Sequence, residues 1–249
     1  KETEVLMKPL LVLLTGCAFA SSFTTTLLAD EPAAVSVGPA VGALTSAPSS
    51  NCAPLILHTD GGYEDAVSWK SGGQVAPYWG AFAERFVGPL LICGLVYDLT
   101  QIGYYSGQPA DLYIWNDHLG QPGSVRYMHL GVNLGSIATW PEISRHTIAV
   151  EGAQYQSDIF WVGIWGEWPH AVNGWFVAVD DTGPIGATPM TNIIGGIGYE
   201  PAGWQPVNTV WNDVYALGIG VLARTPNPAG IPEPQVHPGS WGRVKSLYN

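Results

Sequence analysis

Short apolar runs recur along the chain, and Gly, Pro, Asn or Asp stands between successive runs. The run Asp111–Trp115 is aromatic and β-branched, and polar residues partly alternate with apolar ones within Leu91–Tyr105. Both features are typical of strands, and no competing window combines a helical period with capping residues. The pattern predicts strands over residues 55–58, 81–87, 91–105, 111–115, 125–132, 144–150, 159–165, 175–179 and 215–223.

Successive strands without intervening helices predict an all-β fold, an antiparallel two-sheet β-sandwich. Two long connections, over residues 181–196 and 198–212, favour jelly-roll-like crossings over a tight meander. A body of this size can bury about two-thirds of its surface, which is enough for a proper core. The absence of an internal sequence repeat argues against a propeller or a solenoid.

The N-terminal segment has the pattern of an export signal. A positively charged start precedes an apolar, charge-free run, which predicts a secretory signal peptide over residues 1–29. Cleavage after Ala29 and cleavage after Ala20 are both compatible with the small residues present. An alternative is lipidation at Cys17, because the residues that end at Cys17 resemble a lipoprotein box. A permanent membrane anchor is less favoured because Ser and Thr dilute the run, and no later stretch is long and apolar enough to span a bilayer.

Composition divides the remainder into three parts. Residues 30–53 are rich in Ala, Pro and Ser and predict a flexible linker. Residues 54–223 form the predicted sandwich, and residues 224–249 form a Pro-rich tail. The expected location is therefore secreted, either extracellular or at the cell surface.

The charge balance excludes some partners. The chain has 9 Lys and Arg against 20 Asp and Glu, for a net charge of −11, and its basic residues are scattered. Nucleic-acid binding needs a basic stripe, so no nucleic-acid partner is expected. Residues 218–223 match a dinucleotide fingerprint on paper, but Pro226 and Pro228 follow where that motif needs a helix, so no nucleotide is expected.

Two cysteines follow the signal segment, Cys52 and Cys93. An even number in an oxidising compartment predicts one disulfide between them. The alternative is two separate thiols, with Cys93 a small core residue. A zinc site is not expected because no paired Cys or His–Cys spacing exists.

The order of turn and aromatic motifs resembles a known kind of domain. The motifs are HTDGGYEDAVSW, LYIWNDHLGQPGS, DIFWVGIWGEWP and GYEPAGWQP. This order is similar to a jelly-roll-like β-sandwich domain of secreted, largely uncharacterised bacterial proteins. The resemblance covers residues 55–223 and rests on spaced turn signals. It implies an extracellular sandwich and carries no catalytic residue.

The 11 Trp residues are the main functional signal. Several must lie in the core, because a buried indole supplies a large apolar area. Trp168, Trp204 and Trp211 lie in predicted loops beside Gly or Pro, so we expect them to be exposed and to stack on sugar rings. The expected partner is an extracellular polysaccharide or another cell-surface component.

Acidic residues suggest two further kinds of site. Asp60 and Glu64 lie in a Gly-containing turn and predict a structural Ca²⁺, the one cofactor considered, with plain surface acidity as the alternative. Glu167 has aromatic neighbours that would raise its pKa, and Asp180 or Asp181 would supply the second carboxylate of a small glycoside hydrolase. The alternative is that Glu167 lies at the tip of a hairpin and Asp181 begins a turn.

The sequence thus favours an exported, non-enzymatic β-sandwich that acts as an extracellular binding or structural module. A carbohydrate-binding module that uses loop Trp residues is the first alternative. A small glycoside hydrolase that uses Glu167 is the second. No serine-hydrolase elbow and no HExxH metal motif is present.

Overall fold

A computed structural model describes residues 54–69, 79–103, 109–167, 174–182, 188–193, 203–211 and 214–226. The predicted signal peptide, the linker and the tail beyond residue 226 lie outside the described residues. No helix among the described residues is both long and apolar enough to cross a membrane.

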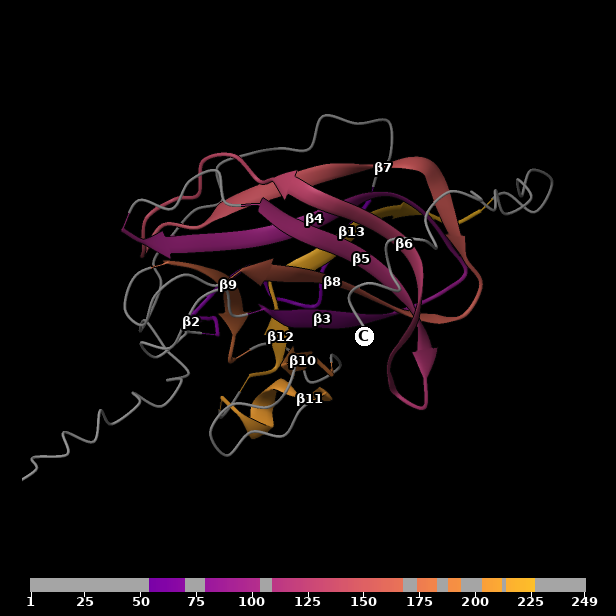
Figure 1. Cartoon of the computed structure of the whole chain (residues 1–249). Coiled ribbons are helices and arrows are strands. Elements are labelled where there is room, and N and C mark those ends of the chain that lie inside the picture. Colours follow the sequence, from indigo (N-terminus) through magenta and orange to yellow (C-terminus); the bar gives the residue numbers. More distant parts are fainter. Residues whose placement is uncertain are drawn as a thin grey trace, which may run out of the picture.

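Within these residues the strands form two antiparallel sheets, as predicted (Figure 1). Sheet A contains β1 (Leu55–Ile56), β2 (Asp65–Val67), β4 (Leu90–Ile102), β7 (Ser144–Gln156), β9 (Gly174–Asp180), β12 (Ala216–Leu217) and β13 (Ile219–Arg224). Sheet B contains β3 (Trp79–Val87), β5 (Pro109–His118), β6 (Gln121–Asn133), β8 (Ile159–Glu167), β10 (Met190–Ile193) and β11 (Gly203–Pro206). The 3-10 helix η1 (Val207–Thr209) follows β11.

Sheet B has the strand order β11-β10-β3-β8-β5-β6, and the backbone of sheet A follows β1-β13-β4-β9-β12. In sheet A, β2 also pairs with β9, and β7 pairs with β4. The chain crosses repeatedly between the sheets, since β3, β5, β8 and β10 of sheet B alternate with β4, β7 and β9 of sheet A. Such crossings place residues distant in sequence face to face across the core.

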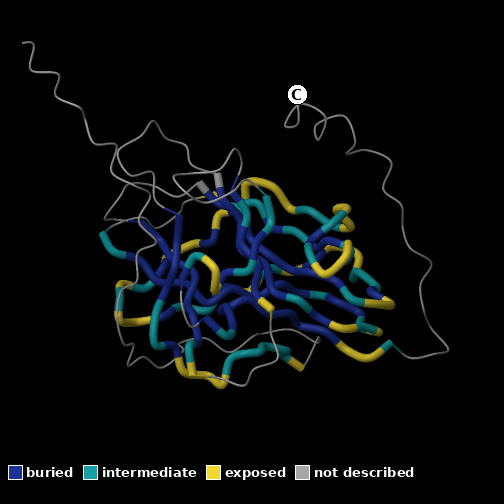
Figure 2. Tube along the Cα trace, turned by 90° about the horizontal axis from the view of Figure 1, so that it is seen from below, coloured by how far each residue is buried: buried dark blue, intermediate teal, exposed yellow. Residues whose placement is uncertain are grey.

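The main core lies between the sheets, and buried residues fill the middle of the molecule while exposed ones gather at turns (Figure 2). Period-2 alternation sends Phe82 and Phe86 of β3 into this core. Strand β9 is buried at every position. This follows because Tyr63 and Ile143 cover its outer side at Ala178, so that both faces of the strand are packed.

The nine predicted strands all correspond to observed strands, with the last of them divided into β12 and β13. The two predicted long loops are partly wrong. Strand β10 lies within the first and β11 within the second, and together they extend sheet B at one edge. Both are only four residues long, too short for a pattern of alternation to be visible.

Candidate functional site

Aromatic side chains gather on the outer face of sheet B, away from the main core. Strand register places Trp161 and Trp165 of β8 on the same face as Tyr113 and Trp115 of β5, because residues paired across strands point to one side. Trp204 of β11 reaches this face through Asn192 and Ala81. We call Tyr113, Trp115, Trp161, Trp165 and Trp204 the aromatic face.

Three of these rings, those of Tyr113, Trp115 and Trp204, contact one another in sequence. Tyr113 and Trp115 stack with ring centroids 4.9 Å apart and an interplanar angle of 14°. Trp204 meets Trp115 edge-on, with centroids 5.3 Å apart and planes at 76°. Trp161 donates a hydrogen bond from Nε1 to Asp117 Oδ1 at 2.8 Å, which fixes its indole. The stacked pair and the edge-on pair both have geometries that aromatic rings prefer.

Small residues beneath the rings let them lie close to the sheet. Ala81, Ala83 and Gly163 occupy the outward positions of the two central strands. A Cβ on Gly163 would lie 2.8 Å from Trp115 Cζ3 and 2.2 Å from a backbone oxygen, so this ring covers the bare glycine. The sequence therefore builds a sheet surface on which flat side chains rest.

The aromatic face is concave. Strands β11 and β5 are separated by three strands in sheet B, yet the rings of Trp204 and Trp115 touch. Cα atoms of β11 and of the opposite edge strand β6 also approach within 8 Å. A flat sheet would hold these two edges about 24 Å apart, at about 4.8 Å per strand. Sheet B therefore curls around this face.

The members of the aromatic face differ in exposure. Trp161 is fully buried and Trp115 is 5% exposed, so they form its floor together with Met190. Tyr113, Trp165 and Trp204 are half-buried and keep accessible surface. Asp111 and Asn192 share the row of Trp165 and Trp204 and add polar groups. Aromatic walls with a few polar groups are the usual lining of a ligand site.

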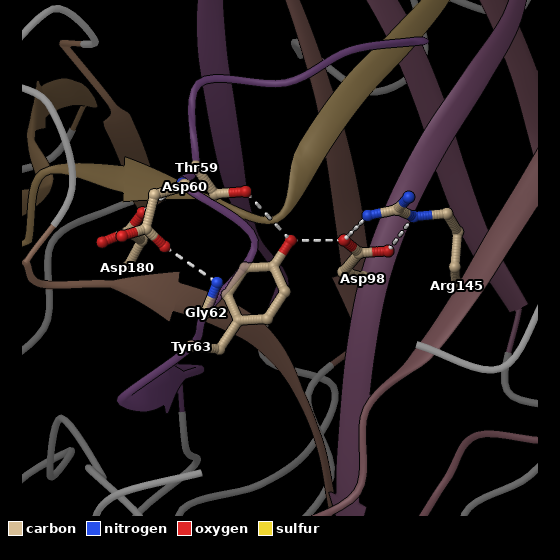
Figure 3. Close-up of polar contacts among 7 residues, drawn as sticks. All are labelled: Thr59, Asp60, Gly62, Tyr63, Asp98, Arg145 and Asp180. Atoms are coloured by element: carbon tan, nitrogen blue, oxygen red, sulfur yellow. Dashed lines mark hydrogen bonds and ion pairs between the residues drawn. The ribbon is translucent and has the colours of Figure 1, made fainter. Parts of the chain in front are cut away.

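A second notable cluster covers the outer face of sheet A (Figure 3). Asp98 is fully buried and accepts hydrogen bonds from Arg145 Nε at 2.7 Å and Arg145 Nη2 at 2.6 Å. The Tyr63 hydroxyl donates to the same carboxylate. Burial, and then the charge of Asp98, raises the pKa of Tyr63 far above its ordinary value, so the phenol stays protonated. This cluster clamps the segment before β2 onto β4 and β7.

The two carboxylates of the predicted calcium site accept hydrogen bonds from backbone amides. Asp60 Oδ1 accepts from Gly62 N at 2.8 Å, and Glu64 Oε2 accepts from Asp181 N at 3.1 Å. Asp180 accepts from the backbone of Asp60 at 2.8 Å (Figure 3). The described residues contain no group of three or more His, Cys, Asp or Glu that could hold a metal ion. The structural Ca²⁺ at Asp60 and Glu64 stays a prediction.

Glu84 lies in the main core, on the inward face of β3. Its Oε1 accepts from Leu217 N of β12 at 2.6 Å, and its Oε2 lies 3.2 Å from Nδ1 of His58. His58 stacks on Phe86 with centroids 4.8 Å apart. Burial raises the pKa of Glu84, and the His58 contact opposes that shift. The carboxyl bridges the two sheets, which gives it a structural task.

Ser144 and His146 form a serine–histidine pair on β7. His146 Nδ1 lies 2.6 Å from the Leu134 carbonyl, which can only accept, so Nδ1 carries the proton and donates it. Nε2 lies 2.8 Å from Ser144 Oγ, which also accepts from Ala138 N at 3.0 Å. Burial lowers the pKa of His146. These bonds fasten the loop between β6 and β7, which is a structural role.

The outcome differs among the three tryptophans that the sequence predicted to bind a ligand. Trp204 is half-buried on the aromatic face, and Trp168 lies outside the described residues. The expected exposure of Trp211 is wrong, since it is 5% exposed and lies in the core. Its ring meets Trp69 at 4.7 Å and Phe82 at 5.5 Å, because the η1 turn directs it inward.

The remaining predicted site residues are the two cysteines and the two carboxylates of the hydrolase alternative. Cys52 lies outside the described residues, whereas Cys93 packs on the outer face of sheet A beside Val96 and Leu222. The side chain of Glu167 is also outside them. Asp180, its expected partner, is fully buried and accepts backbone hydrogen bonds.

Sequence reasoning missed four members of the aromatic face: Tyr113, Trp115, Trp161 and Trp165. A signal for them existed in period-2 spacing, since Tyr113 and Trp115 stand two apart and Trp161 and Trp165 four apart in predicted strands. Aromatic residues at such spacing line one face of a strand.

A comparison of the chain with protein-family models, curated proteins and solved structures gives no match. The two-sheet sandwich therefore stands on the structure, and the resemblance to secreted bacterial domains stays a prediction.

Proposed function

We propose that this protein is an exported, non-enzymatic β-sandwich that binds polysaccharide through the aromatic face of sheet B. The observation that carries the proposal is the set of five aromatic side chains on one concave sheet surface, three of which keep accessible area. Flat rings stack on the C–H faces of sugar rings, and a concave face follows an extended chain of them.

Three buried carboxylates have structural tasks, which supports a binding role for these residues over hydrolysis. Glu84, Asp98 and Asp180 are fully buried, and each accepts hydrogen bonds that hold structure together. A glycoside hydrolase needs two carboxyl groups that flank a substrate bond. None of these three carboxylates lies on the aromatic face.

Export is the second part of the proposal, and a disulfide between Cys52 and Cys93 belongs with it. Export is supported by the apolar, charge-free run before residue 30. The disulfide is supported by Leu55, which is three residues after Cys52 in the sequence and packs in the same outer cluster as Cys93. Disulfides of this kind persist outside the cytoplasm.

The test compares Trp204→Ala with Trp140→Ala, a matched removal of a half-buried indole on the other side of the molecule. The purified chain is incubated with insoluble cellulose, chitin, xylan and pectin, and the bound fraction is measured. We expect binding to at least one polysaccharide, a loss of about tenfold or more in Trp204→Ala, which corresponds to about 1.4 kcal/mol, and unchanged binding in Trp140→Ala. Absence of binding to all four, or an equal loss in both variants, would refute the proposal.

A further inference from the structure

Arg85 stands beside the aromatic face with its charge uncompensated. It is half-buried on β3 and is the direct cross-strand partner of Trp161, so its side chain leaves the sheet on the same side. Trp161 in turn pairs with Trp115 on β5. One row across three strands thus places a half-buried guanidinium beside the two buried indoles that form the floor of the aromatic face.

No ion pair or side-chain hydrogen bond among the described residues involves the guanidinium of Arg85. The contrast is Arg145, whose guanidinium is fully engaged by Asp98 on sheet A. The acids nearest the aromatic face have other donors, since Asp117 accepts from Trp161 and from Gly120 N. Asp111 accepts from a backbone amide of β6.

We propose that Arg85 binds the carboxylate of an acidic sugar, so that the aromatic face selects glycans that contain uronic acid residues. This inference rests on the proposed function and names the class of glycan. A planar guanidinium matches a carboxylate with two parallel hydrogen bonds. Because Arg85 lies beside the aromatic face, its guanidinium is placed to meet the carboxylate of a pyranose that stacks there.

The net charge of −11 does not prevent this recognition at ordinary ionic strength. At 0.15 M salt the Debye length is about 8 Å, so repulsion from distant carboxylates is screened while a contact ion pair is retained. Arg85 lies on β3, one of the two central strands of sheet B. Asp111 and Asp117 lie on β5, two strands away from β3.

The experiment measures binding of the full chain to polygalacturonate and to its fully methyl-esterified form at 0.15 M NaCl. The two polymers share one backbone, and esterification removes the charge and adds only a methyl group to each carboxyl. We expect wild type to bind the free acid at least tenfold more tightly. Arg85→Gln should bind both forms equally, and Arg85→Lys, which keeps the charge but not the planar fork, should show an intermediate preference. Arg224→Gln is the control, an exposed arginine on sheet A that should keep the full preference.

The outcomes separate the two proposals. Equal binding of both polymers by wild type, or a full preference retained in Arg85→Gln, overturns the role of Arg85 and leaves polysaccharide binding intact. Binding by wild type to neither polymer and to no other glycan tested overturns the proposed function as well. Circular dichroism and the urea midpoint of each variant establish that it is folded before binding is measured.

Discussion

The ion pair between Arg145 and Asp98 gives a sharp stability prediction. The Asp98 side chain is 0% exposed and that of Arg145 is 11% exposed. Replacing Arg145 with Met keeps most of the volume, but among the described residues it leaves the buried Asp98 carboxylate with the Tyr63 hydroxyl as its remaining side-chain donor. Removal of one partner from a buried pair costs about 3–5 kcal/mol. For a body of this length that is a fall in Tm of roughly 6–20 °C.

Urea unfolding followed by Trp fluorescence measures this loss. Arg85→Met is the matched control, because it removes a half-buried arginine that has no ion pair among the described residues, and it should shift stability by no more than about 0.5 kcal/mol. Adding Asp98→Asn to Arg145→Met should recover part of the loss, since the buried charge is then gone. A loss below about 1 kcal/mol in Arg145→Met, or equal losses in both arginine variants, would refute the reasoning.

Three further predictions concern other parts of the sandwich. Gly163→Ala should cost about 3 kcal/mol in urea unfolding, because the new Cβ would lie 2.2 Å from the Phe82 carbonyl oxygen; an unchanged midpoint would contradict that contact. Burial lowers the pKa of His146 from 6.5, so its contribution to stability is complete above pH 6.5 and is lost as pH falls through its folded-state pKa. Wild type should therefore lose unfolding free energy relative to His146→Asn between pH 7 and pH 5, and parallel profiles would exclude this linkage. A disulfide between Cys52 and Cys93 would close a loop of about 40 residues, so Cys52→Ser should lower the free energy of unfolding by roughly 4 kcal/mol. Dithiothreitol should lower it equally in wild type. A reductant effect that persists in the variant would rule out this pairing.

The sequence was sufficient for the longer strands, but not for the short strands β2, β10 and β11 or for the faces that the strands present. In β8, Phe160, Val162 and Ile164 face the core while Trp161 and Trp165 face outward. Both sets are apolar, so no alternation of polar and apolar residues marks which is which. The outward set forms a candidate site only because sheet B curls and brings in β11, a strand far along the chain.

Trp211 shows why loop position alone misjudged exposure. Its neighbours are typical of a loop, and only the η1 turn, in which Trp211 N donates to Val207 O at 2.8 Å, reverses the chain toward the core. The buried Glu84 was equally invisible, because its partners Leu217 and His58 are distant in sequence. Such pairings depend on topology that one sequence does not encode locally.

The curl of sheet B also bears on how accessible its edge strands are to other chains. An exposed edge strand offers unpaired amides and carbonyls to other chains and so promotes intermolecular sheet growth. With only 12% charged residues, this chain has few charges with which to repel such docking. The edge strands β6 and β11 approach each other within 8 Å, so an incoming strand would meet the opposite edge at the place where they converge. We expect the curvature to hinder edge-to-edge pairing at that place, a task that surface charge performs in many proteins.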